Sequence, residues 1–237
     1  MKVEPVVSIV IPTLNEALYL EKTLVSLKLQ EVSYNYEIIV SDGYSEDNTI
    51  EIARKYVDKV VMESKRTVAA GRNKGASVAD GKILVFCTAD TYYPKSWLKL
   101  IIAPIIKEGY GVAIGPLYPL EGNLIENIFS RLFLLPYGYF ASLLKLYYVG
   151  GENIAVHKGI FRRLSGFNQD MVTSEDTDFV KRASKITKIK FESKAGVYVS
   201  MRRVRKWGYV NYIKFHARNY INYHLYNKTY SRYEPIR

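Results

Sequence analysis

Acidic side chains mark three places in the chain where chemistry could occur. Asp90 comes directly after the apolar run 83–87, Asp42 follows an earlier apolar run, and Glu175 and Asp176 begin a late helix. Ligands of open α/β sheets bind beyond the carboxyl ends of the strands, so Asp90 and Asp42 have the position of functional groups. A carboxylate there can hold a divalent cation, accept a hydrogen bond or take a proton from a hydroxyl group.

The same acidic residues also have ordinary structural explanations. Asp42 lies in a loop rich in turn-forming residues, and Ser45 or Asp47 of that loop can cap the helix that follows. Asp176 lies in the first turn of a helix whose predicted cap is Ser174, and the exposed N–H groups of a first turn favour negative charge. Residue type and position alone leave both explanations open.

The first half of the chain alternates extended apolar segments with helical ones. This order is typical of an α/β fold with a mainly parallel sheet and helices on its faces. Leu20, Leu24 and Leu27 recur at helical spacing behind Asn15, a predicted helix cap, so their stripe should pack on the sheet. The expected strands are 7–11, 37–40, 60–62 and 83–87, and the expected helices begin after Asn15 and Asp47 and cover 68–79 and 95–107.

Beyond Gly109 the alternation becomes irregular. A helix is expected after Ser174, and an apolar segment, 132–146, is interrupted by Pro136 and Gly138. That segment could lie in a membrane interface but could hardly cross a bilayer, and we expect neither a signal peptide nor a membrane-spanning run of about 18 or more apolar residues. Short strands are expected over 112–114, 189–192 and 197–201.

The composition fits one folded domain with at most one appendage. The 237 residues are 48% hydrophobic and include a single cysteine, Cys87, which lies inside an apolar run. Such a chain can bury a sizeable core, and disulfide bonds take no part in its stability. We therefore expect a cytoplasmic protein, bound at most to the cytoplasmic face of the membrane.

The net charge of +11 is concentrated near the C-terminus. Residues 201–237 contain nine Lys and Arg residues against one acidic residue, Glu234. The helix expected over 209–226 is apolar on several sides, so it resembles a membrane-surface helix. An anionic surface, whether phospholipid or nucleic acid, suits this charge, and a solvated helix is the plainer alternative.

Five motifs follow one another along residues 7–206. They are 7–16; the loop of Asp42, Gly43, Ser45, Asp47, Asn48 and Thr49; the group Gly71, Arg72, Asn73 and Gly75; the pair Ala89 and Asp90; and the pair Glu175 and Asp176. In this order they resemble the motifs of family 2 glycosyltransferases, which have the nucleotide-sugar transferase fold called GT-A. The fold that the resemblance implies is a mainly parallel nucleotide-binding sheet flanked by helices, with a less regular acceptor half and a C-terminal helical tail.

The resemblance also implies a division of the chain. Residues 1–206 would form the GT-A domain, with the nucleotide-sugar half in 1–108 and the acceptor half in 109–206. Residues 207–237 would form the basic aromatic tail.

For the donor, the resemblance implies a nucleoside-diphosphate sugar of the UDP or GDP type. Asp42 would accept a hydrogen bond from the base, which suits a carboxylate because it is an acceptor only. Arg72 would reach the base or the pyrophosphate, although a surface cation on a helix is its structural alternative. Arg202 or Arg203 could clamp the pyrophosphate. The remaining donor-binding residues would be Pro12, Thr13, Asn15, Glu16, Ser45, Ala89 and Asp90.

Asp90 matches the second Asp of the family's Asp-x-Asp motif, which contacts the divalent metal, Mg²⁺ or Mn²⁺. Thr88 stands where the first Asp is expected. Mg²⁺ is often held by one or two carboxylates with phosphates and water, so one Asp need not abolish binding. A metal held mostly by the donor is therefore predicted.

Asp176 matches the second residue of the family's Glu-Asp motif and would be the general base of an inverting transfer. It would deprotonate an acceptor hydroxyl that attacks the anomeric carbon while the nucleoside diphosphate leaves on the opposite side. Glu175 would bind acceptor or sugar hydroxyls. The acceptor would be a glycan or a lipid-linked group, with peripheral membrane contact and without nucleic acid as a partner.

Two other classes of protein remain as alternatives. A sugar nucleotidyltransferase shares a related sheet, but its Gly-rich opening loop with a basic residue is absent after Ile11. A nonenzymatic or degenerate basic protein on an anionic surface would use the same carboxylates only as turns and caps, and would bind nucleic acid with a steep salt dependence.

Overall fold

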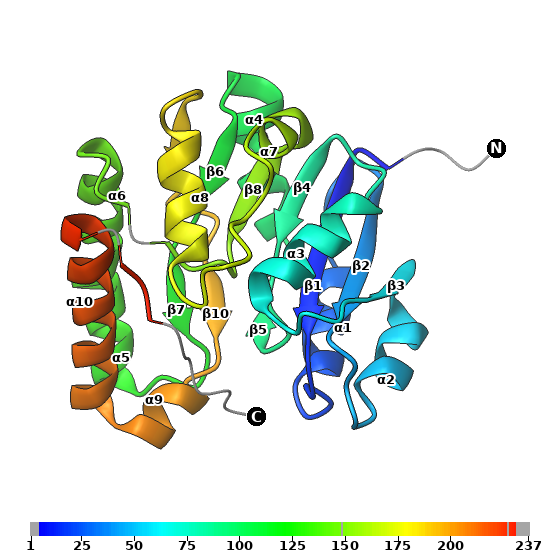
Figure 1. The fold of residues 1–237 in the computed structure, drawn as a ribbon, viewed down its shortest axis with the longest axis horizontal. Coiled ribbons are helices and arrows are strands. Elements are labelled where there is room, and N and C mark those ends of the chain that lie inside the picture. The colour runs from blue at the N-terminus through cyan, green and yellow to red at the C-terminus, as the bar shows by residue number, and fades with distance from the viewer. Residues whose placement is uncertain (1–4, 148, 227, 231–237) are drawn as a thin grey trace.

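A seven-stranded sheet forms the centre of the protein (Figure 1). The computed structural model describes residues 5–147, 149–226 and 228–230. The strand order is β3-β2-β1-β4-β8-β6-β9, and β8 is the one described strand that runs antiparallel to both of its neighbours. This is the mainly parallel sheet that the sequence predicts. Its strands are β1 (Val7–Thr13), β2 (Tyr36–Asp42), β3 (Lys59–Met62), β4 (Ile83–Phe86), β6 (Val112–Ile114), β8 (Ile154–His157) and β9 (Ile189–Phe191).

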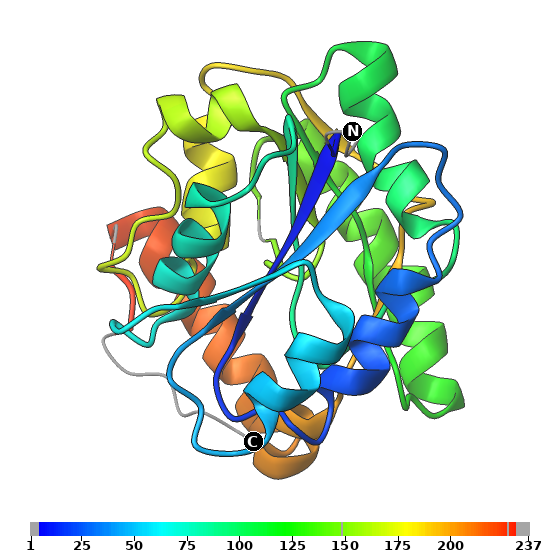
Figure 2. The ribbon, with the colours of Figure 1, turned by 90° about the vertical axis from the view of Figure 1, so that its right-hand side faces the viewer.

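Helices cover both faces of the sheet, as Figure 2 shows in a view turned by 90°. One face packs against α1 (Leu20–Lys28), α2 (Thr49–Tyr56) and α4 (Trp97–Glu108), and the predicted leucine stripe of α1 is fully buried there. The other face packs against α3 (Val68–Ser77), α7 (Lys158–Arg163) and α8 (Glu175–Ala183). The central strands β1 and β4 are apolar on both sides because each side meets a helical layer.

A second, three-stranded sheet connects the two halves of the chain. Its order is β5 (Thr91–Tyr92), β10 (Val197–Val199) and β7 (Leu117–Pro119). Strand β5 begins one residue after Asp90, and β10 is followed by α9 (Arg202–Trp207). The backbone N–H of Ser200 donates to the carbonyl oxygen of Asp90 at 3.1 Å. This sheet therefore brings the start of α9 back to the end of β4.

The cap predicted at Asn15 is wrong. Helix α1 begins only at Leu20, and its N-cap is Tyr19, whose side chain makes no capping bond. Asn15 has a left-handed backbone with φ of 54°, and its side-chain oxygen accepts the N–H of Glu46 at 2.8 Å. The side chain of Asn15 therefore connects two loops through this hydrogen bond and does not cap α1.

Strand β8 and helix α7 were not anticipated from the sequence. Strand β8 inserts between β4 and β6 and pairs antiparallel with both. Three of its four residues are fully buried, which places this short apolar segment at the core of the sheet.

The apolar segment 132–146, which contains Pro136 and Gly138, is helical throughout most of its length. Helix α5 (Leu124–Phe129) leads through a π-helix (Ser130–Leu134) into α6 (Leu135–Leu143). Pro136 lies two residues after the π-helix; a proline inside a helix removes one backbone hydrogen bond, and helices are commonly irregular at prolines and π-bulges.

The tail helix is confirmed as α10 (Tyr209–Tyr226), whereas residues 231–237 lie outside the described part of the chain. Across the described helices, the combination of length and apolar character needed to span a membrane does not occur. The division of the chain at 108 and 206 stays a prediction.

Candidate functional site

The loops after β1 and β2 are fastened to each other by hydrogen bonds. The backbone N–H of Asn15 donates to Ser45 Oγ at 2.8 Å, and that of Glu16 donates to Thr49 Oγ1 at 2.8 Å. The Asn15 side chain completes the connection through its bond from Glu46. Asn15 and Ser45 therefore connect the two loops, and their predicted contact with the donor stays a prediction.

Asp42 lies beneath these loops and is fully buried, with 0% of its surface exposed. Its Oδ2 accepts the hydroxyls of Thr13 at 2.8 Å and of Ser45 at 2.7 Å, and its Oδ1 accepts the N–H of Ser45 at 2.7 Å. Both carboxylate oxygens thus hold the two loops together. A bond from Asp42 to a nucleobase stays a prediction, and it would need one of the remaining lone pairs of the carboxylate.

A hollow of about 110 Å³ opens beside the two loops. It borders the start of α3, where Thr67 Oγ1 caps the helix by accepting the N–H of Ala70, and a helix N-terminus suits a phosphate group. Gly71 allows α3 to approach β1, because a Cβ there would lie 2.9 Å from Cβ of Pro12. The hollow is lined by Pro12, Thr13, Leu14, Glu16, Ser41, Gly43, Glu63, Arg66, Thr67, Val68 and Gly71.

Arg66 and Glu63 also line this hollow, although neither is among the predicted site residues. Arg66 has a left-handed backbone with φ of 57°, and its N–H donates to the carboxylate of Glu63 at 2.9 Å. Its guanidinium is 45% exposed and 3.8 Å from Glu46, so it can reach a ligand in the hollow. The short polar turn between the strand and the glycine-bearing helix was the available signal.

Asp90 faces an arginine. Arg202 Nε lies 2.9 Å from Asp90 Oδ2, and Arg202 Nη1 and Nη2 each donate to the carboxylate of Glu16 at 2.9 Å. The hydroxyl of Thr88 shares a hydrogen bond of 2.8 Å with that of Thr91. Within residues 5–147, 149–226 and 228–230, no group of three or more His, Cys, Asp or Glu side chains could hold a metal ion.

Arg72 is buried, so the alternative of a surface cation is wrong. It is 2% exposed and forms an ion pair with Glu175, Nη1 to Oε1, at 2.8 Å. Its guanidinium packs 5.2 Å from the ring centre of Phe167 and directly on Gly151, where a Cβ would lie 1.8 Å from Nη2. Arg72 does not line the hollow, and its predicted contact with the donor stays a prediction.

Asp176 is partly buried at the start of α8. Its Oδ2 accepts the N–H of Gly151 at 2.8 Å, and its Oδ1 accepts the N–H of Thr177 at 2.6 Å. Burial, followed by the charge of Glu175, raises the pKa of Asp176 to about 8. A carboxyl group with this pKa can exchange protons near neutral pH, as a general base must.

Ser174 occupies the N-cap position of α8, but its side chain makes no capping bond. Its backbone is left-handed with φ of 61°, and its Oγ accepts the side-chain N–H of Asn219 in α10 at 2.7 Å. The same amide accepts the hydroxyl of Thr173 at 2.9 Å. The expected cap is therefore a contact with the tail helix.

Glu152 is a third acidic group near Arg72, and no sequence pattern predicted it as a site residue. Its Oε2 is a buried atom that has no hydrogen-bond partner in the described structure. Burial raises the pKa of Glu152, while the charge of Arg72 opposes that rise. Glu152, Glu175 and Asp176 thus share one neighbouring guanidinium. The signal in the sequence was a glycine pair followed by an acidic residue in an otherwise apolar region.

The chain matches the family model described as glycosyl transferase family 2 over residues 8–166. It belongs to this family. The match favours a glycosyltransferase over the nucleotidyltransferase and the nonenzymatic binding protein. Asp176 and Arg202 lie beyond the matched residues of the family 2 model, so their roles depend on the geometry described above.

Curated relatives of this family 2 chain include two archaeal enzymes. Glycosyltransferase AglE of Haloferax volcanii is 26% identical over 76% of this chain and 62% of its own length. A dolichol-phosphate mannosyltransferase of Pyrococcus furiosus is 34% identical over 51% of this chain and 35% of its own length. The chain therefore spans less than two thirds of the length of these relatives.

Solved structures with a similar fold are GT-A glycosyltransferases. S. aureus TarS 1-349 in complex with UDP has a TM-score of 0.66 at 20% identity, covering 85% of this chain and 62% of that one. The mannosyltransferase PcManGT from Pyrobaculum calidifontis in complex with GDP-Man and Mn²⁺ has a TM-score of 0.69 at 20% identity, covering 93% and 63%. The fold of this family 2 chain is accordingly of the GT-A type, as predicted.

Two predicted site residues take up other contacts. Arg203 lies over the ring of Trp207, 5.0 Å from its centre, whereas its neighbour Arg202 faces the acidic groups. Ala89 is buried, and its carbonyl oxygen accepts the hydroxyl of Thr23 at 2.8 Å. The structure thus brings Glu16, Asp90 and Arg202 into direct contact and leaves Arg203 beside them.

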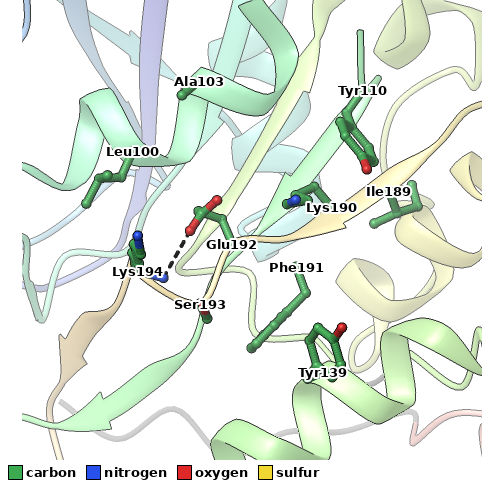
Figure 3. A pocket seen from close by; sticks show the side chains of 10 residues that line it. All are labelled: Leu100, Ala103, Tyr110, Tyr139, Ile189, Lys190, Phe191, Glu192, Ser193 and Lys194. Atoms are coloured by element: carbon green, nitrogen blue, oxygen red, sulfur yellow. Dashed lines mark hydrogen bonds between the residues drawn. The ribbon is translucent and has the colours of Figure 1, made fainter. Parts of the chain in front are cut away.

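A larger hollow of about 550 Å³ lies between α4, α6 and β9 (Figure 3). Its wall combines aromatic residues such as Tyr139 and Phe191 with charged ones, and the N–H of Lys194 donates to Glu192 there. None of the predicted site residues lines this hollow. The hollow beside β1 and α3 is therefore the better candidate for the nucleotide.

Proposed function

We propose that this family 2 chain transfers a sugar from a nucleoside-diphosphate donor to a hydroxyl group or lipid phosphate of an acceptor. The observation that carries the proposal is the meeting of two acidic groups at one edge of the sheet. Asp90 follows β4 and Asp176 is the second residue of α8, and a chain of hydrogen bonds connects their surroundings. The N–H of Gly151 donates to Asp176 at 2.8 Å, the carbonyl oxygen of the next residue, Glu152, accepts the hydroxyl of Tyr93 at 3.1 Å, and that hydroxyl accepts the N–H of Thr88, two residues before Asp90, at 3.0 Å. This closeness supports a reaction site at which a donor near Asp90 and an acceptor near Asp176 would meet.

In the proposed reaction, Asp176 accepts the proton of the acceptor hydroxyl. The hydroxyl oxygen attacks the anomeric carbon, and the bond to the nucleoside diphosphate breaks on the opposite face, so the configuration inverts. The N–H groups of Gly151 and Thr177 hold both carboxylate oxygens of Asp176 and orient it. Positive charge near the diphosphate, from Arg202 and Arg66, stabilises the leaving group.

We expect UDP or GDP to raise the melting temperature of the protein. A ligand bound only by the native state adds about 2.7 kcal/mol of stability at a hundred times its dissociation constant. UDP-bound TarS and GDP-Man-bound PcManGT support these two nucleotides as the first to test. A thermal-shift screen with UDP, GDP, ADP and CMP measures the preference.

The matched variants for this screen are Arg66→Ala at the hollow and Lys55→Ala on the exposed side of α2. Arg66→Ala should lower the shift because it removes a cation from the hollow, and Lys55→Ala should leave it unchanged. A complete lack of response to all four nucleotides would count against the proposed donor.

The sequence also predicts Mg²⁺ or Mn²⁺ on Asp90, and PcManGT is in complex with Mn²⁺. A divalent cation of this kind needs several oxygen ligands. Near Asp90, the hydroxyl of Thr88 is bonded to Thr91 and the Asp90 carboxylate is bonded to Arg202. The described residues therefore do not form a site that would hold a metal ion without the nucleotide, and no step of the transfer is assigned to one.

We further propose that the outer faces of α5, α6 and α10 contact an anionic membrane, which would suit a lipid-linked acceptor. Large apolar side chains are exposed on all three helices, among them Ile125 at 77%, Phe140 at 60% and Leu225 at 72%. Helix α10 joins α5 through a hydrogen bond from Tyr209 to Glu126. Cationic residues between the apolar ones favour anionic headgroups.

The protein is expected to float with vesicles that contain phosphatidylglycerol and to remain behind with vesicles of phosphatidylcholine alone. The double variant Val210→Asp/Ile213→Asp should lose most of this binding, because both side chains are exposed on α10, at 64% and 59%. Leu29→Asp, which changes an exposed apolar residue after α1, should float normally. Equal flotation of the double variant and the wild type would contradict the proposed surface.

A further inference from the structure

Arg202 directs three of its N–H groups at two carboxylates. Nη1 and Nη2 bind both oxygens of Glu16 at 2.9 Å, and Nε binds Oδ2 of Asp90 at 2.9 Å. The guanidinium also lies over the ring of Tyr19, 4.6 Å from its centre. The three charged side chains are only 14–17% exposed, so water screens their interaction weakly.

The backbone fixes this arrangement from both sides. Asp90 precedes β5, Arg202 follows β10, and the two strands pair with Val199 opposite Thr91. The bond from Ser200 N–H to the Asp90 carbonyl adds a further tie. Glu16 is held by its own N–H bond to Thr49. Arg202 is therefore positioned by the fold and does not reach Asp90 from a free surface loop.

Two structural properties distinguish this place from a metal site. After β4, Asp90 is the one carboxylate of the motif, because position 88 has a threonine whose hydroxyl is bonded to Thr91, and the second carboxylate nearby, Glu16, has both oxygens bonded to Arg202. The cationic partner of Asp90 is a guanidinium that is already bonded to it, and charge-assisted hydrogen bonds of this kind are strong. A guanidinium has five N–H groups, so three bonds to carboxylates leave two for phosphate oxygens.

We propose that Arg202 takes the place of the divalent cation at Asp90, so that this chain binds its nucleotide diphosphate without a metal ion. Glu16 acts as a positioning residue that aims the guanidinium, and the remaining N–H groups of Arg202 bind the diphosphate. The inference rests on the proposed function, since it assumes a nucleoside-diphosphate donor. It explains why a single Asp after β4 is enough to bind the nucleotide diphosphate.

Titration calorimetry with UDP and GDP tests this inference without any measurement of turnover. Binding of the preferred nucleotide to the wild type should be the same, within about threefold, in EDTA and in Mg²⁺ or Mn²⁺. Arg202→Gln should weaken binding in EDTA by about 10- to 100-fold, the loss expected for hydrogen bonds from a charged group. The nucleotide affinity of Arg202→Lys should lie between those of the wild type and Arg202→Gln, because lysine keeps the positive charge but lacks the planar set of N–H groups of the guanidinium.

Lys206→Gln is the matched control, since Lys206 lies exposed on the same helix, α9. It should bind as the wild type does, and circular dichroism should show that all variants are folded. Restored binding of Arg202→Gln on addition of Mn²⁺ would support the inference, because it would show that a metal ion can occupy the place of the guanidinium.

Two results would overturn the inference. One is wild-type binding that disappears in EDTA and returns with Mn²⁺ or Mg²⁺. The other is unchanged binding of Arg202→Gln in EDTA. Failure of the wild type to bind UDP, GDP or any other nucleotide under every condition would instead overturn the proposed function.

Discussion

Replacing Asp176 by Asn is expected to lower the rate of sugar transfer by about 10²- to 10⁴-fold and to leave nucleotide binding unchanged. The amide keeps the size of the side chain and can still accept the N–H of Gly151, but it cannot take a proton from the acceptor. Comparison of single-turnover transfer with calorimetric nucleotide binding separates the two effects.

The pH dependence gives this prediction a second measurement. Burial and the charge of Glu175 raise the pKa of Asp176 to about 8, so the base is protonated at lower pH and loses its proton as the pH rises through that value. The kcat/KM of the wild type should therefore rise with pH up to about 8, and the residual activity of Asp176→Asn should lack this rise.

Asp170→Asn is the control for Asp176, because Asp170 is an exposed carboxylate that pairs only with Lys65 among the contacts described. It should transfer sugar at the wild-type rate. Retained turnover of Asp176→Asn would remove Asp176 from the reaction and leave Glu152 or Glu175 as the candidates for the base.

Replacing Arg72 by Met is expected to destabilise the protein by about 3–5 kcal/mol. The change leaves Glu175 unpaired in the interior, and removal of one partner of a buried ion pair carries a cost of this size. Glu152 and Asp176 lose the same neighbouring positive charge. Urea unfolding of the wild type and the variant measures the difference.

The double variant Arg72→Met/Glu175→Gln distinguishes the ion pair from the packing of the arginine. It should recover a large part of the lost stability, because the unpaired charge is gone and only the contacts with Phe167 and Gly151 are missing. A double variant as unstable as Arg72→Met would show that packing, and not charge, explains the loss.

Local patterns predicted most of the elements but few of the contacts within the site. The helical spacing of the leucines predicts α1, and the uninterrupted apolar run predicts the buried strand β4, without any knowledge of the tertiary structure. The partner of Arg72 is 103 residues away and that of Arg202 is 186 residues away, and no local pattern encodes such distances. The resemblance to the family singled out these arginines, whereas their bonds depend on how α8 and α9 pack against the sheet.

Short elements could not be predicted from the sequence for a similar reason. Strand β8 has four residues after a glycine pair, too few for a period to be recognised, and its neighbours β4 and β6 supply the burial that makes it a strand. At Asn15 and Ser174 the sequence suggested helix caps, but distant partners, Glu46 and Asn219, take up their side chains. In both cases a tertiary contact replaced the local one.

The contact between Asn219 and Ser174 decides how shortened forms of this chain can be interpreted. One buried amide of α10 holds both residues that precede the acidic pair of α8, Thr173 and Ser174. A truncation that ends before Asn219 would remove this support together with the exposed apolar surface. Loss of turnover in such a form would therefore say nothing about lipids, and the C-terminal boundary of any expressed fragment must lie beyond Asn219.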